Sequence, residues 1–147
     1  MLAWSTKKFE ELSPGELYAI LRLRSEVFVV EQTCVFQDMD NKDQFSYHLM
    51  GWKNNELVAY TRLIPPGISY EQASIGRVVT APAARSKGAG KLLMEKSIAV
   101  LENLFGKVPV RIGAQLYLKK FYSSFGFEQS SEVYDEDGID HIEMIRQ

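Results

Sequence analysis

The sequence passes from an apolar segment, through a turn of small residues, directly into a long amphipathic stretch. The apolar segment, Ala73–Thr80, is rich in Ile and Val, which is typical of a strand buried inside a sheet. From Gly88 to Phe105 the apolar residues recur at the spacing of one helix face, and they are Met94, Ile98, Leu101 and Phe105. A strand that leads straight into a helix predicts an α/β or α+β fold, in which helices flank a mixed β-sheet.

Sequence patterns along the rest of the chain predict the other elements. The segment Ser13–Glu16 begins a helix of about four turns, because Ser13 suits the N-cap and Glu16 completes a capping box. The further strands expected are Ser46–Lys53, Glu56–Ile64, Val108–Ala114, Phe127–Tyr134 and Ile139–Ile145, and a short helix is expected over Leu116–Phe125. Asn54-Asn55 and Asp137-Gly138 are the hairpin turns. A chain of 147 residues fits a single domain spanning residues 1–147.

Composition and charge exclude several classes of partner. The 17 basic and 19 acidic residues give a net charge of -2, so no overall field attracts nucleic acid or an anionic membrane. No apolar run would span a bilayer, and no signal peptide is visible. Cys34 is the only cysteine, so no intrachain disulfide can form, and we expect a cytoplasmic protein. We also expect a monomer or a homodimer. The acidic segment Glu31–Gln44 lacks the glycine of a calcium loop, so we expect solvated acids and no metal.

The turn before the long helix has the composition of an anion site. Backbone N–H groups at a helix start have no intrahelical partner, and they lie at the positive end of the helix dipole. The residues that add charge or allow close approach are Arg85, Lys87, Gly88, Gly90 and Lys91. Phosphate is the natural anion for such a site, although on the glycines alone a turn with surface charges is an equal alternative. The Walker A and dinucleotide motifs do not fit, since Leu92 follows Lys91 and the glycine spacing differs.

Two motifs carry a resemblance to a known family. Arg85–Gly90 resembles the Arg/Gln-x-x-Gly-x-Gly signature of the GNAT acetyltransferases, and Ala114–Phe127 resembles their second signature, which ends Phe-Tyr-x-x-x-Gly-Phe. The segments Leu23–Gln32 and Tyr134–Ile142 are similar to the ElaA-like branch of that superfamily. The resemblance implies a mixed central sheet that is splayed between its fourth and fifth strands, with acetyl-CoA in the opening.

The resemblance also implies roles for particular residues. Those expected along acetyl-CoA are Val78, Val79, Thr80, Arg85, Ser86, Lys87, Gly88, Ala89, Gly90, Lys91, Gln115 and Tyr122. The N–H of Val79 is expected to face the thioester oxygen, and Tyr122 is expected to be the general acid that protonates the leaving thiolate. Without the resemblance, the aromatic cluster around Tyr122 would indicate core packing. Gln115 departs from the Asn that the family commonly has at this position.

The acceptor side is less well defined. No acid stands on the two strands that border the opening, so a general base must come from elsewhere or act through water. Glu31 and His141 are candidates, although His141 could equally be a hairpin side chain with a local hydrogen bond. His48 is expected to be structural. Arg24 and Arg77 could orient an acceptor carboxylate or pair with the loop acids.

Taken with the resemblance, these features predict direct transfer of an acetyl group from acetyl-CoA to a primary amine of a small molecule or a protein. The alternative is a non-catalytic acyl-CoA-binding sensor or regulatory module. Tyr122 favours the enzyme, and the absence of a carboxylate on the strands leaves the alternative open.

Overall fold

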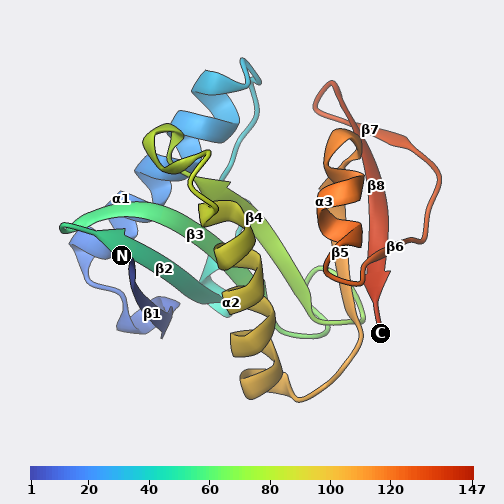
Figure 1. Ribbon diagram of the computed structural model, residues 1–147, viewed down its shortest axis with the longest axis horizontal. Helices are drawn as coiled ribbons and strands as arrows, with labels where there is room; N and C mark the ends of the chain where they lie inside the picture. The colour runs from blue at the N-terminus through green and yellow to red at the C-terminus, as the bar shows by residue number, and fades with distance from the viewer.

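The computed structural model describes residues 1–147 as two antiparallel sheets flanked by three α-helices (Figure 1). The first sheet has the order β1-β2-β3-β4, and the second has the order β5-β8-β6, with β7 also paired to β8. The strands are β1 (Ala3–Lys8), β2 (Tyr47–Lys53), β3 (Glu56–Ile64), β4 (Ser74–Thr80), β5 (Val110–Gln115), β6 (Glu128–Gln129), β7 (Tyr134–Glu136) and β8 (Ile139–Arg146). The helices are α1 (Pro14–Arg24), α2 (Ala89–Phe105) and α3 (Lys119–Ser123). None of them is long and apolar enough to cross a membrane.

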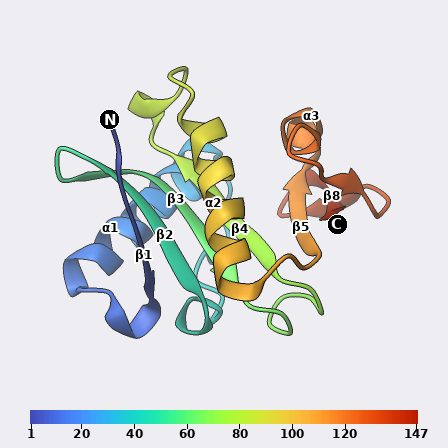
Figure 2. The same ribbon diagram turned by 60° about the horizontal axis from the view of Figure 1, so that its bottom comes forward.

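The two sheets meet at one point and then diverge. Ala73 forms a single parallel bridge with Val110, and the N–H of Arg111 donates to the carbonyl oxygen of Ala73 at 2.9 Å. Beyond this point β4 and β5 separate, and Figure 2 shows the second sheet standing apart from the first. The predicted fold class is therefore confirmed, with the opening between the fourth and fifth strands.

The first sheet has a separate apolar cluster on each face. On one face α1 contributes Ile20 and Leu23, which pack with Met50 of β2. On the other face α2 packs against β2, β3 and the second sheet, and its buried residues are Leu93, Met94, Ile98 and Leu101. Three of the four positions on the predicted helix face are thus buried, and the predicted face is confirmed.

The strand β4 contains a bulge beside the opening. Between the pairs Tyr60–Val79 and Arg62–Gly76, β4 has one residue more than β3. Arg77 lies in the bulge with a φ of 51°, a value that is uncommon for a residue other than glycine. Because a bulge re-aims side chains and bends its strand, this irregularity changes how β4 faces the opening.

The structure differs from the predicted elements in three places. The edge strand β1 was not predicted, since its residues AWSTKK show no clear alternation of buried and exposed positions. The single strand predicted over Phe127–Tyr134 is wrong, because β6 and β7 are separate short strands. The first helix begins with the predicted capping box at Ser13, but after α1 it continues as a π-helix over Ser25–Glu31.

Candidate active site

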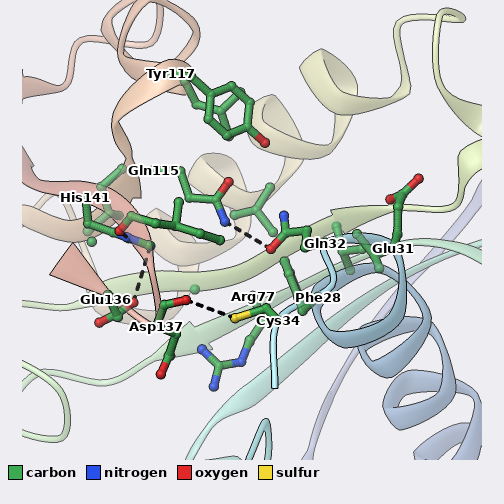
Figure 3. A pocket seen from close by; sticks show the side chains of 18 of the residues that line it. Phe28, Glu31, Gln32, Cys34, Arg77, Gln115, Tyr117, Glu136, Asp137 and His141 are labelled. Atoms are coloured by element: carbon green, nitrogen blue, oxygen red, sulfur yellow. Dashed lines mark hydrogen bonds and ion pairs between the residues drawn. The ribbon is translucent and has the colours of Figure 1, made fainter. Parts of the chain in front are cut away.

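A cavity of about 570 Å³ fills the opening between β4 and β5 (Figure 3). Its walls come from both strands, from the end of the π-helix, from α3 and from the turn between β7 and β8. A second cavity of about 450 Å³ borders the first. The residues that line both are Phe36, Ile75, Gly76, Arg77, Gly113, Glu136 and Asp137. The two cavities therefore adjoin in the space between the two sheets.

The edge of β4 presents backbone groups to this opening. The N–H of Ala81 donates to β3 at 2.8 Å, so the alternation of antiparallel pairs directs the N–H of Val79 to β3 as well. The same alternation turns the N–H and C=O of Thr80 toward the opening. In agreement, the Thr80 carbonyl accepts a hydrogen bond from Arg85 at 3.3 Å. The geometry thus corrects the expectation for Val79, whose amide is committed to the sheet.

The turn that precedes α2 leaves several amides without partners. The N–H groups from Ser86 to Lys91 donate no hydrogen bond to another backbone group. Gly88 is the N-cap of α2 with a φ of 74°, a conformation that glycine adopts without strain. A Cβ at Gly90 would lie 3.9 Å from Phe121 of α3, so this glycine faces α3. Unpaired amides at the start of a long helix form the kind of anion site that the sequence indicated.

Arg85 and Glu31 form an ion pair at the edge of the cavity. The two guanidinium nitrogens of Arg85 donate to the two carboxylate oxygens at 2.7 and 2.6 Å. The hydrogen bond from Arg85 lowers the pKa of Glu31, which therefore stays ionised and is a weak base. Of the two predicted bases, Glu31 is thus already engaged by a cation.

Tyr122 packs in the hydrophobic core and also lines the cavity. Its ring packs edge-on against Phe121 and Phe127, with centroids 5.2 and 6.2 Å away. The residue is 6% exposed and lines the cavity, and its hydroxyl makes no hydrogen bond to another protein group. Burial, with a smaller effect of Tyr117, raises the pKa of Tyr122, so the phenol keeps its proton. A protonated hydroxyl that lines the cavity and has no partner in the protein is available to donate to a ligand.

Two hydrogen bonds connect opposite walls of the cavity (Figure 3). The amide of Gln115 on β5 donates to the side chain of Gln32 at 3.3 Å. The thiol of Cys34 donates to the carbonyl oxygen of Asp137 at 3.3 Å. These contacts join the end of the π-helix and the segment after it to the second sheet. The predicted cofactor residue Gln115 is therefore engaged across the opening in this conformation.

His141 lies on β8 and faces the cavity. Its Nδ1 is 2.8 Å from the carbonyl oxygen of Ile139, which is the local hydrogen bond considered from the sequence. Its Nε2 is 3.3 Å from a carboxylate oxygen of Glu136 (Figure 3). The local hydrogen bond considered from the sequence is therefore present, and the side chain also lines the cavity, while its role as a base stays a prediction.

Arg24 does not reach the cavity. It is completely buried, and its guanidinium donates to Asp38 at 2.8 Å and to Asp43 at 2.7 Å. Asp38 and Asp43 are themselves 8% and 6% exposed, so the expectation that the loop acids are solvated is wrong for these two. Of the two sequence interpretations, the structure shows Arg24 paired with loop acids.

Arg77 belongs to the same ion network and also lines both cavities. Its Nε donates to Asp38 at 2.8 Å, and its guanidinium lies 5.8 Å from the ring centre of Phe36. Arg62 completes the network by binding Asp40 through both terminal nitrogens at 2.7 Å. Hydrogen bonds and charge from Arg62 lower the pKa of Asp40, although burial opposes this shift. The acidic segment is thereby fastened to α1, β3 and β4.

Several cavity residues were not found from the sequence. They are Phe28, Gln32, Cys34, Phe36, Glu136, Asp137 and Ile139. Glu136 and Asp137 could have been found from the predicted turn at Asp137-Gly138. A hairpin with this turn places Glu136 directly opposite Ile139 and close to His141. The residues near the π-helix gave no comparable signal.

Comparison with known proteins agrees with this geometry. The model of a family described as an acetyltransferase (GNAT) domain matches residues 11–147. The chain belongs to the GNAT acetyltransferase family. It is 45% identical to Protein ElaA of Escherichia coli strain K12, and the match covers 100% of this chain and 97% of that protein.

Two solved structures are also similar over their whole length. A crystal structure of an acyl-CoA N-acyltransferase from Pseudomonas aeruginosa has a TM-score of 0.96 and 44% identity, with complete coverage of both chains. The crystal structure of Escherichia coli ElaA has a TM-score of 0.94 and 44% identity, again with complete coverage of both. Membership of the GNAT family supports acyl-CoA-dependent N-acyltransfer as the general activity.

Proposed function

We propose that this protein transfers an acetyl group from acetyl-CoA directly to a primary amine, with Tyr122 as the general acid. The observation that carries the proposal is the unpartnered hydroxyl of Tyr122 in the cavity between β4 and β5. When bound, acetyl-CoA would supply the acetyl group as an activated thioester. The other parts of the cavity fit that donor.

Two backbone surfaces would hold the donor. The unpaired amides from Ser86 to Lys91 suit a pyrophosphate, and Lys87 and Lys91 add positive charge. The edge of β4 at Thr80 presents an N–H and a C=O that can pair with an extended arm containing amides. Because Val79 donates to β3, Thr80 replaces it as the amide best placed to polarise the thioester oxygen. The Thr80 carbonyl already accepts one hydrogen bond from Arg85, and its second lone pair is available to the donor.

Tyr122 would donate a proton as the carbon–sulfur bond breaks. A thiolate leaves more readily when a nearby acid gives it a proton or a hydrogen bond. The raised pKa of Tyr122 keeps the phenol protonated at neutral pH, so the donor form is present before each turnover. Its ring is fixed by Phe121 and Phe127, so little motion is needed to aim the hydroxyl.

The test is Tyr122→Phe, which removes the hydroxyl and keeps the packed ring. We expect kcat to fall by about 10²–10⁴-fold, the usual contribution of general acid catalysis, while the affinity for acetyl-CoA stays close to that of the wild type. Release of CoA is followed with a panel of primary amines, and binding of acetyl-CoA is measured by calorimetry. Tyr117→Phe is made in parallel, since Tyr117 is the other phenol that lines the cavity.

Two results would contradict the proposal. Single-turnover chemistry at the wild-type rate in Tyr122→Phe would remove the acid role, and a loss in Tyr117→Phe would transfer it to Tyr117. A wild-type protein that binds acetyl-CoA but releases no CoA with any amine would instead support the non-catalytic acyl-CoA-binding module.

A further inference from the structure

The acceptor side of the cavity holds a histidine and a carboxylate that the acid step does not use. We propose that His141, positioned by Glu136, takes the proton that an alkylammonium acceptor must lose before its nitrogen attacks the acetyl group. This inference rests on the proposed function, because it assigns the base and the acceptor class of that reaction.

The reaction needs a proton acceptor for a simple reason. A primary alkylamine has a pKa near that of lysine, about 10.4, so at neutral pH almost all of it is the ammonium ion. An ammonium nitrogen has no free electron pair and cannot attack a carbonyl carbon. Neither β4 (SIGRVVT) nor β5 (VRIGAQ) contains an Asp or Glu that could remove the proton. The base must therefore come from another wall of the cavity.

Three carboxylates line the first cavity, and two of them are poorly suited to this task. Glu31 is held by Arg85 through both oxygens, and its pKa is lowered by that contact. Asp137 is exposed at the tip of the β7–β8 turn, and its contact with Cys34 is made by its backbone carbonyl, so nothing positions its carboxylate. The third carboxylate, Glu136, lies against the ring of His141.

The hydrogen bonds of His141 leave one nitrogen ready to accept a proton. A carbonyl oxygen only accepts hydrogen bonds, so the contact of Nδ1 with Ile139 at 2.8 Å places the ring hydrogen on Nδ1. In the neutral ring Nε2 then carries the electron pair, and it faces the carboxylate of Glu136 at 3.3 Å. When Nε2 is unprotonated, its electron pair and the Glu136 carboxylate repel each other. When a proton binds to Nε2, the imidazolium and the carboxylate form an ion pair. The ring of Tyr134 stacks on the imidazole at 5.9 Å and 29°, which fixes its plane.

The cation that lines both cavities together with Glu136 is Arg77, and its guanidinium is paired with Asp38 at 2.8 Å. Across the sheet His141 is paired with Gln115 of β5 and Tyr134 of β7, and neither side chain is cationic. Glu136 forms no ion pair other than that with His141. An incoming ammonium group therefore meets the carboxylate of Glu136 beside Nε2 of His141. This arrangement favours a cationic amine over a neutral or acidic acceptor.

The proton balance of the step is complete without an additional reactant. One N–H bond of the ammonium breaks, its electron pair stays on nitrogen, and the proton moves to Nε2 of His141. The neutral amine then attacks the acetyl carbon, and its nitrogen loses a second proton as the amide forms. That second proton passes through water to the phenolate of Tyr122, which has given its own proton to the leaving thiolate. The imidazolium of His141 returns its proton to water after the product leaves.

The test compares two amines that share a two-carbon skeleton and differ in charge. Ethylamine is an ammonium ion near neutral pH, whereas the fluorines of 2,2,2-trifluoroethylamine keep it mainly neutral. CoA release is measured at saturating acetyl-CoA for the wild type, His141→Gln and Glu136→Gln. For His141→Gln we expect kcat/KM to fall by about 10²-fold with ethylamine and to change little with trifluoroethylamine. For Glu136→Gln we expect a smaller loss with the same dependence on the amine.

A matched control lies on the same strand. Glu143 also points from the polar face of β8, but it pairs with Arg111 at 2.9 Å and does not line either cavity. Glu143→Gln removes one carboxylate from the same sheet, and we expect wild-type rates with both amines. A loss in this variant that equals the loss in Glu136→Gln would show a general charge effect and would overturn the proposal.

The remaining outcomes separate this inference from the proposed function. Equal losses with the two amines, or no loss in His141→Gln, would overturn the role of His141 while leaving acetyl transfer intact. If His141→Gln fails to fold, Glu136→Gln is still informative because its side chain is 58% exposed, and wild-type rates with ethylamine would then refute the pair. A wild-type protein that binds acetyl-CoA and acetylates neither amine would overturn the primary-amine function and this inference with it.

Discussion

Replacing Gly90 with alanine separates what this residue does for the fold from what it does for ligand binding. Gly90 is in the first turn of α2, its φ is outside the left-handed region, and a Cβ there would come no closer than 3.9 Å to Phe121. Alanine therefore fits the backbone without strain. Because alanine is favoured over glycine in helices by about 1 kcal/mol, we expect the free energy of unfolding to rise by about 0.5–1 kcal/mol. For a chain of this length, that raises Tm by about 1–4 °C.

The same methyl group is expected to weaken binding of acetyl-CoA. It enters the space between the start of α2 and Phe121 of α3, where the unpaired amides must approach the pyrophosphate closely. Gly90→Leu has a similar helix propensity and a larger side chain, so we expect a similar apo stability and a greater loss of affinity. Gly88→Ala is the matched comparison, because Gly88 has a φ of 74° and open space around it. A left-handed residue with a Cβ costs about 1–2 kcal/mol, so this variant should be less stable than the wild type.

Melting curves with and without acetyl-CoA distinguish the two effects. A ligand at 100 times its Kd stabilises the native state by about 2.7 kcal/mol, so a tenfold loss of affinity is readily measured. We expect Gly90→Ala to melt above the wild type when free and to show a smaller shift with acetyl-CoA. A full ligand shift in both Gly90→Ala and Gly90→Leu would refute the assignment of this turn to the pyrophosphate. If the ligand-free Gly90→Ala variant is less stable than the wild type, alanine does not fit the helical backbone at this position without strain.

Two further predictions follow from buried groups. Cys34→Ala should keep most of the turnover, because direct transfer needs no acyl-cysteine; mass spectrometric detection of acetylated Cys34 during turnover would contradict this. Burial lowers the pKa of His48, so this residue stays neutral in the native state while the unfolded chain binds a proton below about pH 6.5. Stability measured by urea unfolding should therefore fall as pH drops below about 6.5, and the lowered pKa values of Asp40 and Asp43 should add a further loss below about pH 4. A flat profile between pH 7 and 5 would contradict the role of His48.

Local signals predicted several elements around the cavity. The capping box at Ser13 has hydrogen bonds of 3.1 and 2.8 Å in both directions, and the turn at Asp137-Gly138 joins β7 to β8 as expected. The helix after the glycine turn begins at Ala89, one residue after the predicted start. Each of these features depends on residues close in sequence, so the pattern is enough to find them.

Features that depend on the pairing of distant segments could not be predicted in the same way. Contacts such as Cys34 with Asp137, which are 103 positions apart, arise only when the two sheets are in place. Whether the N–H of Val79 points to β3 or to the opening depends on the register between β3 and β4. A shift of one residue in this register would reverse its direction. Sequence periodicity fixes which residues form a strand but not which backbone groups its neighbour occupies. For this reason Thr80 was not distinguished from Val79 before the register was known.

The bulge in β4 connects the buried ion network to the donor edge. Arg77 adopts a left-handed φ of 51°, which costs about 1–2 kcal/mol for a residue with a Cβ. Its guanidinium donates to the carboxylate and the carbonyl of Asp38 at 2.8 Å each, and charged hydrogen bonds of this kind are worth about 1.5–3 kcal/mol. The network can therefore hold the strained residue in place. Since the extra residue of the bulge lies just before Val79 and Thr80, the acids of the loop also stabilise the strand geometry that presents Thr80 to the opening. The acidic segment thus acts on the donor site through β4, although Asp43 and the buried Arg24 line neither cavity.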